Sequence, residues 1–198
     1  MKESIRFLNE KISKMKQGIL IILIGLFSFN SQAQTDSTVA KRGKIGVAIN
    51  SSVNGEVYPI RLVPSITYLK GKSQFELGFG VHPFIRKDQN IFSGEFNYKY
   101  FPNGTEKKFN MYVIGRFSYI HNPRKTFHPT TYNYLFLNGG YGFQLTPFKN
   151  AYLGTNFTAG TYTYNKRSEV DIPGAVEKNL FDSFGFNLAF QFNIGYRF

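Results

Sequence analysis

Three histidines, His82, His121 and His128, are the residues of this sequence best suited to acid–base or metal chemistry. A hydrolase would need one of them beside a serine and a carboxylate at a common site, and a zinc site would need clustered ligands. The histidines are scattered, no cluster of carboxylates accompanies them, and the chain has no cysteine. We therefore expect no catalytic residue, no metal site and no cofactor, with the histidines in loops or at rims.

Two glycine-rich stretches, "GFG" at 78–80 and "NGGYG" at 138–142, could suggest phosphate-binding loops. Such loops need a following helix whose N-terminus binds the anion, and no helical pattern follows either stretch. Glycine inside a strand more often marks close packing against a large neighbour, or a kink. We interpret both stretches in that way.

In the segments that must position these residues, apolar and polar residues alternate with a period of two, which is typical of β-strands. Ordinary strands average about 5–6 residues, whereas a tilted strand that crosses a membrane needs about 9–11. The segments found here hold 11 to 15 residues each. They are 43–54, 58–70, 74–85, 91–101, 108–121, 132–146, 151–164 and 184–198.

The connections between these segments alternate in length. Three are tight and rich in Gly, Pro and Asn, namely 71–73, 102–107 and 147–150, and they are separated by the connections 55–57, 86–90, 122–131 and 165–183. Short turns at one end and longer loops at the other are typical of outer-membrane barrels, whose turns face the periplasm. The fold class predicted is all-β, an eight-stranded antiparallel up-and-down transmembrane β-barrel. The short connection 55–57 fits this scheme least well.

One face of each segment is apolar and largely aromatic, and the other is small or polar. The same alternation fits a soluble, lipocalin-like binding barrel with its faces inverted, so alternation alone leaves both open. Strand length and aromatic content favour lipid outside. Six aromatic residues near the turn ends are expected to form an interfacial girdle: Tyr68, Phe75, Tyr100, Phe109, Tyr152 and Tyr196. Four tyrosines have the inward parity near the loop end, so either the strand ends rise above the membrane there or a bulge shifts the register: Tyr132, Tyr134, Tyr162 and Tyr164.

The N-terminus has the layout of a secretory signal peptide. Lys14 and Lys16 precede an apolar run at 19–27, and Ser31-Gln32-Ala33 supplies a small-x-small cleavage site. The apolar run is about half of the roughly 20 residues that a spanning helix needs. We expect a signal peptide at 1–33, a short lead at 34–42 and a barrel domain at 43–198. A translation start at Met15 is the alternative, because the stretch before it is unusually long.

The chain is basic. Residues 1–33 hold five of the 24 Lys and Arg and two of the 12 Asp and Glu, so the remainder carries a formal net charge of +9. An exported chain does not meet nucleic acid, so we expect anionic lipid head groups as the counter-charge. The basic loop residues that could contact lipopolysaccharide phosphates or a protein partner are Arg124, Lys125, Lys166, Arg167 and Lys178.

Charged side chains on the inward parity must pair, because an eight-stranded barrel is just wide enough for side chains to fill it. A reversal centred on 103–106 places Glu95 opposite Arg116, and one centred near residue 88 places Glu76 opposite Lys99. We predict a lumenal network of these two pairs, with Arg61 and Arg197 in or near it. A lumen filled in this way would not conduct.

The last segment, "FGFNLAFQFNIGYRF", alternates strictly and ends in an aromatic residue. With the "SQAQ" cleavage region and the eight strands, it resembles small outer-membrane barrels of the OmpA/OmpX-like kind. In particular it is similar to the outer membrane protein β-barrel domain families that include PorT-like proteins. The resemblance implies that Phe198, with Tyr196, Ile194 and Phe192, is the signal read by the barrel-assembly machinery. The likeness covers residues 34–198, as a pattern and without a diagnostic motif.

The resemblance leaves several functions open. A monomeric structural or surface-interaction barrel is the reading favoured here, with a narrow porin-like channel as the alternative. Barrels of this kind also include lipid A-modifying enzymes, in which deacylation would place a serine two residues after a histidine. The residues at those positions are Phe84, Pro123 and Thr130, so the pattern is absent. The expected partners are outer-membrane lipids, lipopolysaccharide and, during biogenesis, the assembly machinery.

Overall fold

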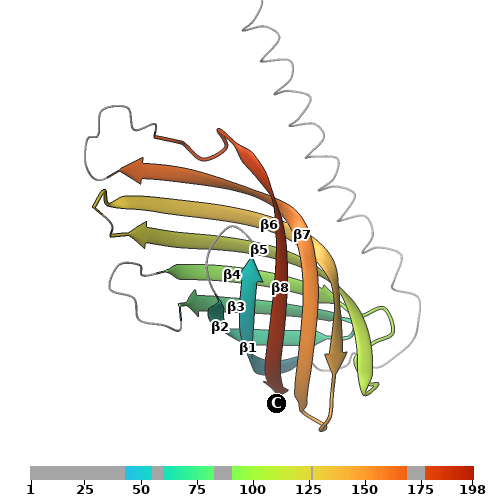
Figure 1. Cartoon of the computed structure of the whole chain (residues 1–198). Helices are drawn as coiled ribbons and strands as arrows, with labels where there is room; N and C mark the ends of the chain where they lie inside the picture. Colours follow the sequence, from blue (N-terminus) through green and yellow to red (C-terminus); the bar gives the residue numbers. More distant parts are fainter. Residues whose placement is uncertain (1–42, 55–59, 83–90, 126, 169–176) are drawn as a thin grey trace, which may run out of the picture. The chain divides into compact units, whose positions relative to one another are not determined.

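The computed structural model describes residues 43–54, 60–82, 91–125, 127–168 and 177–198. The described residues form eight strands (Figure 1): β1 Lys44–Asn54, β2 Arg61–Lys70, β3 Ser73–Val81, β4 Phe92–Tyr100, β5 Phe109–Arg124, β6 Thr130–Leu145, β7 Ala151–Ser168 and β8 Phe184–Arg197. No helix in this described part of the chain is long and apolar enough to span a membrane. The proposed leader lies outside the described residues.

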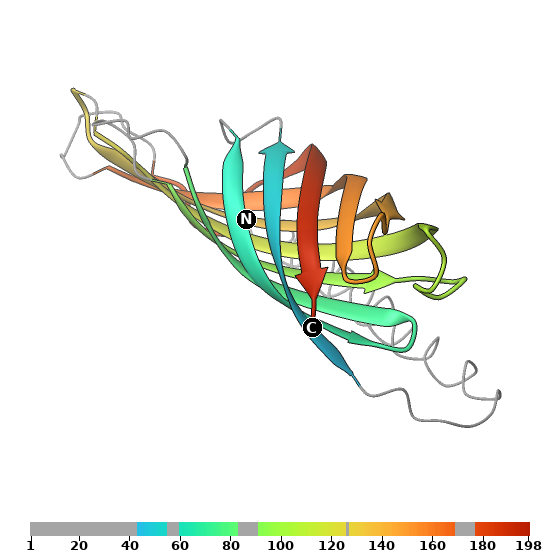
Figure 2. The ribbon, with the colours of Figure 1, turned by 90° about the horizontal axis from the view of Figure 1, so that it is seen from below.

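The strands pair in sequence order, all antiparallel, and β8 closes onto β1 to complete a barrel (Figure 2). This confirms the predicted fold class. Closure removes both edges of the sheet, so every strand has two hydrogen-bonded neighbours. The start of β1 and the end of β8 lie together, because Gly46 faces Arg197. The short turns β2–β3, β4–β5 and β6–β7 lie at that same end, which we call the turn end; the opposite end is the loop end.

The side chains alternate strictly between the two sides of the wall. β2 and β5 show the pattern most clearly, with every second residue buried. The buried positions point into the lumen and are mostly polar. The outward positions carry Ile, Leu, Val, Phe and Tyr, many of which are about half exposed. The outer surface is therefore a continuous apolar belt, the inverse of a soluble protein, in which such residues are usually buried.

Pro64 lies in the middle of β2 with its side chain outward. Pairing between β2 and β3 runs from Lys70 with Ser73 to Ser65 with Gly78 and resumes at Leu62 with Val81. Val63 and Pro64 thus lie in a break of this ladder. Because proline has no N–H, the break is the local cost of placing it in a closed barrel. Pro59 lies outside the described residues.

Three lumen-facing tyrosines lie over glycines of the neighbouring strand. Tyr112 faces Gly142, Tyr152 faces Gly195 and Tyr162 faces Gly185, and a Cβ at each glycine would collide with the facing ring. These strand glycines leave room for a flat aromatic ring against the wall. Tyr152 is fully buried in the lumen, so our assignment of it to the outer girdle was wrong; its even-numbered position on β7 is inward.

Strands β5, β6 and β7 continue beyond the ends of β3 and β4 at the loop end (Figure 1). Their register is unbroken from Leu145 with Leu153 to Thr130 with Ser168, so no bulge shifts it. On the outer face the apolar belt stops and His121, Asn133 and Asn165 follow. This excludes a bulge. Tyr132, Tyr134 and Tyr164 lie on the extension, level with or beyond Ile120. Tyr162 lies lower, inside the belt, because it pairs with Phe136 and with Gly185, whose chain neighbours Phe184 and Phe186 are outward.

Candidate functional site: the polar lumen

Among the described residues, six charged side chains point into the barrel, and each is at most 7% exposed: Arg61, Glu76, Glu95, Lys99, Arg116 and Arg197. They are the residues that the sequence assigns to the lumenal network. The alternation of β2, β3, β4, β5 and β8 turns them inward. Charges buried in this way are tolerated only when hydrogen bonds and opposite charges replace the lost water.

The first group of contacts in the lumen is centred on the carboxylate of Glu76 on β3, which acts as the acceptor. The Lys99 ammonium lies 2.6 Å from Glu76 Oε1, which also accepts a hydrogen bond from Gln74 at 2.7 Å. The other carboxylate oxygen of Glu76, Oε2, accepts a hydrogen bond from Asn97 at 3.2 Å. Lys99 also lies 5.2 Å from the centre of the Tyr112 ring, within cation–π range. The carboxylate thus has three donors, as a buried charge requires.

Arg197 on β8 joins this group near the turn end. It donates to the amide oxygens of Gln74 at 2.7 Å and Gln144 at 3.0 Å. Its guanidinium stacks 4.4 Å from the centre of the Tyr152 ring. Gln74, Gln144 and Arg197 come from β3, β6 and β8, so these bonds run between strands that are not neighbours in the wall.

A second group of contacts in the lumen is centred on Arg116 on β5. It donates from Nε to Asn97 at 3.1 Å and from Nη2 to Asn156 at 2.7 Å, and a further short bond joins it to Gln191. Asn156 in turn donates to Gln191 and to the Tyr112 hydroxyl. Arg116 is therefore held by three neutral amide oxygens from β4, β7 and β8.

Glu95 on β4 pairs with Arg61 on β2, at 3.2 Å, and accepts a long hydrogen bond of 3.4 Å from Gln191. The predicted facing pairs differ from the observed ones. Arg116 faces Asn97 rather than Glu95, and Lys99 faces Gln74 rather than Glu76. In both the β3–β4 and the β4–β5 ladders, the observed pairing is shifted by two residues from the predicted one. In the β4–β5 connection the tight turn closes early, where Gly104 donates to Phe101, and residues up to Lys108 precede β5, so the reversal is asymmetric.

These contacts cross the lumen in several directions. They join β3 to β8, β6 to β8, β5 to β8, β4 to β8 and β2 to β4. Side chains therefore reach across the lumen between strands that are not neighbours in the wall. The network holds four cations and two carboxylates, and amide oxygens serve the two arginines that do not pair with a carboxylate.

The amide and tyrosine partners were missed by the sequence analysis, which looked for charges alone. They are Gln74, Asn97, Gln144, Asn156, Gln191, Tyr112 and Tyr152. Their signal was present, since each has the inward parity of its strand. A buried guanidinium has five N–H donors, so an inward amide side chain should have been expected near every inward arginine.

The histidines lie outside this network. His121 is half-buried on the outer face of β5 and contacts Asn133 Oδ1 through Nδ1 at 2.7 Å. His128 is exposed beside Phe127, and His82 directly follows β3. Among the described residues, no three His, Cys, Asp or Glu side chains are grouped as a metal site would require.

The basic residues singled out at the loop end lie on the β5–β7 extension and the connections beside it. Arg124 stacks on Tyr132, with 4.8 Å to the ring centre, and Lys178 donates to the Tyr164 hydroxyl at 3.0 Å. Lys166 forms a backbone bridge with Lys178. Lys125 and Arg167 are exposed.

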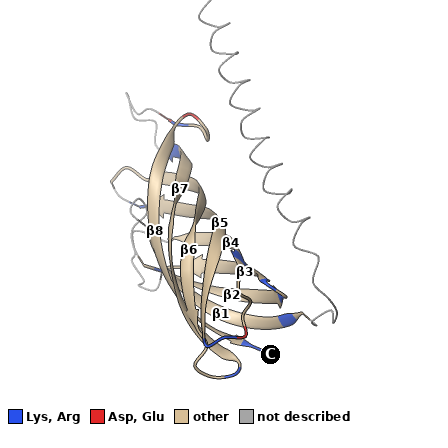
Figure 3. Ribbon diagram, turned by 90° about the vertical axis from the view of Figure 1, so that its right-hand side faces the viewer, with Lys and Arg blue, Asp and Glu red and all other residues tan. Residues whose placement is uncertain are grey.

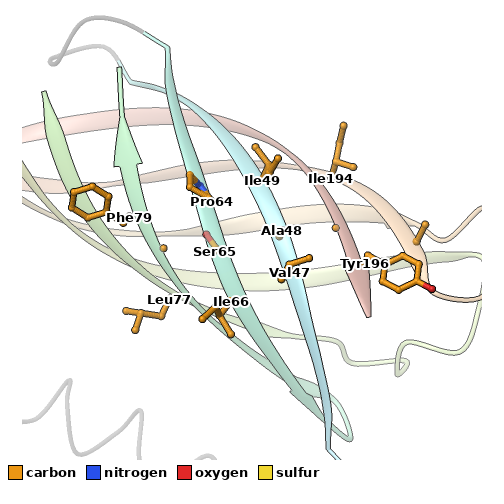
Figure 4. A pocket seen from close by; sticks show the side chains of 13 residues that line it. Val47, Ala48, Ile49, Pro64, Ser65, Ile66, Leu77, Phe79, Ile194 and Tyr196 are labelled. Carbon is orange, nitrogen blue, oxygen red and sulfur yellow. The ribbon is translucent and has the colours of Figure 1, made fainter. Parts of the chain in front are cut away.

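The four residues assigned to an assembly signal, Phe192, Ile194, Tyr196 and Phe198, are exposed on the outer face of β8 or at its end. The Phe198 amide donates to the Ile45 carbonyl at 2.8 Å, so the last residue is tied to β1. An apolar groove crosses this part of the outer wall over β8, β1, β2 and β3 (Figure 4). It runs past Pro64 and opens outward, away from the polar lumen.

Comparison with solved structures identifies the fold. The chain is similar to the N-terminal β-barrel domain of Pseudomonas aeruginosa OprF, with a TM-score of 0.58 and 10% identity over 81% of this chain and 100% of that one. Neisserial surface protein A (NspA) gives a TM-score of 0.51, again at 10% identity, with the same coverage. No protein-family model and no curated protein matches the sequence. The chain thus has the fold of eight-stranded outer-membrane barrels.

Proposed function

We propose that this chain is an integral outer-membrane protein with a side-chain-filled lumen, and that it acts as a structural or surface-interaction protein rather than as an enzyme. One observation carries the proposal. The buried interior is a network of charges and amides, whereas the outer wall is an apolar belt. A wall of this kind is stable only where the surroundings are as apolar as its surface.

The height of the apolar belt supports a location in a membrane. On β5 the outward apolar residues extend from Phe109 to Tyr119, which spans 11 residues. This matches the roughly 9–11 residues of a tilted spanning strand. The expected leader at 1–33 would deliver the chain across the inner membrane. The soluble lipocalin-like alternative is disfavoured, because it needs the aromatic face inside.

Contacts that bridge the lumen favour a closed barrel over the channel alternative. Arg116 reaches Asn156 and Gln191 on β7 and β8, and Arg197 reaches Gln74 on β3. Catalysis by a lipid A-modifying enzyme finds no support in the histidines, since His121 contacts Asn133 and none is followed by a serine at the required position.

Three measurements test the proposal: gel mobility on heating, single-channel conductance and the mass of lipid A on expression. The membrane fraction, run on a gel with and without boiling, should contain a heat-modifiable form, because a folded transmembrane barrel resists detergent. The purified barrel should give no resolved single-channel steps in a planar bilayer. A soluble protein without a heat shift would overturn the membrane assignment. A regular conductance would overturn the closed lumen, and a mass change in lipid A on expression would overturn the non-catalytic role.

A further inference from the structure

The two ends of the barrel differ in charge. Six exposed lysines lie at the turn end: Lys44, Lys70, Lys72, Lys107, Lys108 and Lys149. We call these the turn-end lysines. In the described turns at this end, Glu106 is the only acidic residue. Figure 3 shows the blue segments beside the C-terminus.

The loop end has no such excess. Its connecting segments, 55–60, 82–91, 121–133 and 165–183, together contain seven Lys or Arg and six Asp or Glu. The excess of cations at the turn end is therefore a local feature and not the consequence of a uniformly basic surface. A local excess calls for a local source of negative charge.

The turn-end lysines surround the barrel instead of forming one patch. Lys44 begins β1, Lys70 and Lys72 flank the β2–β3 turn, Lys107 and Lys108 lie in the β4–β5 connection, and Lys149 lies in the β6–β7 turn. Every turn at this end thus carries at least one. A globular partner would contact one sector of the rim, whereas an annulus of lipid contacts all of it.

Their depth is that of a membrane interface. The outward tyrosines Tyr98 and Tyr196 point their hydroxyls at the turns, where Tyr98 contacts Ser73 at 3.1 Å and Tyr196 accepts from Asn150 at 3.2 Å. Tyrosine tips of this kind mark the head-group level. The lysines follow directly, so their long side chains can reach phosphates from the edge of the apolar belt.

We propose that the turn-end lysines bind the phosphates of anionic phospholipids in the leaflet that surrounds this end of the barrel. The inference rests on the membrane residence proposed above. Several lysines near a surface act together on anionic lipids, and their effect weakens as salt rises. The barrel would therefore gather acidic lipid around its turn end and not around its loop end.

The test uses the purified full barrel in phosphatidylcholine vesicles that contain spin-labelled phosphatidylglycerol or spin-labelled phosphatidylcholine. Electron spin resonance gives the motionally restricted fraction of each label, and hence the preference for the acidic lipid. The variant Lys72→Gln, Lys108→Gln, Lys149→Gln is compared with the loop-end variant Lys125→Gln, Lys166→Gln, Arg167→Gln. Both variants lose three positive charges at positions that are at least partly exposed.

We expect the wild type to prefer phosphatidylglycerol by at least about twofold at low salt, and the turn-end variant to lose most of that preference. The loop-end variant should keep it. Equal preference for the two lipids in the wild type, or equal losses in the two variants, would overturn the inference. Failure of the membrane assignment is distinguishable, because it would show as a protein that does not insert or shift on heating.

Discussion

The Lys99 ammonium lies 2.6 Å from Glu76, although the residue that faces Lys99 across the β3–β4 ladder is Gln74. The ion pair is diagonal, and Gln74 donates to the same carboxylate oxygen. Both charged side chains are fully buried. The first prediction concerns this pair, because a buried ion pair costs most when only one partner is removed.

Glu76→Gln leaves a buried ammonium without its counter-charge, and Lys99→Met leaves a buried carboxylate. We expect each to lower the free energy of unfolding by about 3–5 kcal/mol, and the double variant by less than the sum of the two. Urea titration of the heat-resistant gel form measures all three. Additive losses would contradict a direct interaction between the two residues.

A second prediction concerns Arg116, which bridges from β5 to Asn156 and Gln191. Arg116→Ala removes the side chain that links β5 to β4, β7 and β8 across this level of the lumen and leaves three amide oxygens to water. We expect single-channel steps in a planar bilayer where the wild type shows none. Arg167→Ala, at an exposed loop-end position, serves as the control and should give no single-channel steps. A silent Arg116→Ala barrel that still folds would show that other side chains close the lumen.

The strands and their faces could be predicted because period-two alternation depends on local sequence alone, and their order followed from the alternating lengths of the connections. The membership of the charged network followed from the same parity. The partners within it followed only in part, since they depend on register: Glu76 pairs with Lys99 as predicted, whereas Glu95 does not pair with Arg116. A shift of two residues keeps every side chain on its face, so the hydrophobic pattern cannot detect it. Asymmetry in the β4–β5 connection produced such a shift, and Arg61 rather than Arg116 therefore pairs with Glu95.

The glycines supply a third prediction. Gly195 lies under the Tyr152 ring, whereas a Cβ on Gly115 would meet no atom within 4 Å. We expect Gly195→Val to lower the free energy of unfolding by about 1–3 kcal/mol through overpacking. Gly115→Val, on the outer face of β5, is the matched control and should have little effect. Equal losses would mean that strand glycine acts here through the backbone and not through the space it leaves for tyrosine.

A fourth prediction separates assembly from stability at the C-terminus. Phe198 and Phe184 are both exposed, at 72% and 58%, at opposite ends of the outward face of β8. If Phe198 is the assembly signal, Phe198→Ala should reduce the heat-modifiable form in cells by severalfold while leaving refolding in detergent unchanged. Phe184→Ala should affect neither. A refolding defect of Phe198→Ala in detergent would assign the residue to barrel closure instead.

The central claim is that the apolar face of the wall meets lipid and the polar face meets the lumen. The chain has no cysteine, so single cysteines can be introduced and spin-labelled without interference. The neighbours Phe157 and Asn156 on β7 are the sharpest pair, since the first is 55% exposed and the second 2%. In vesicles, a label at Phe157→Cys should be reached by molecular oxygen, which concentrates in the bilayer, whereas a label at Asn156→Cys should be shielded from it. The reverse order, or equal access at both positions, would contradict the assignment of the two faces.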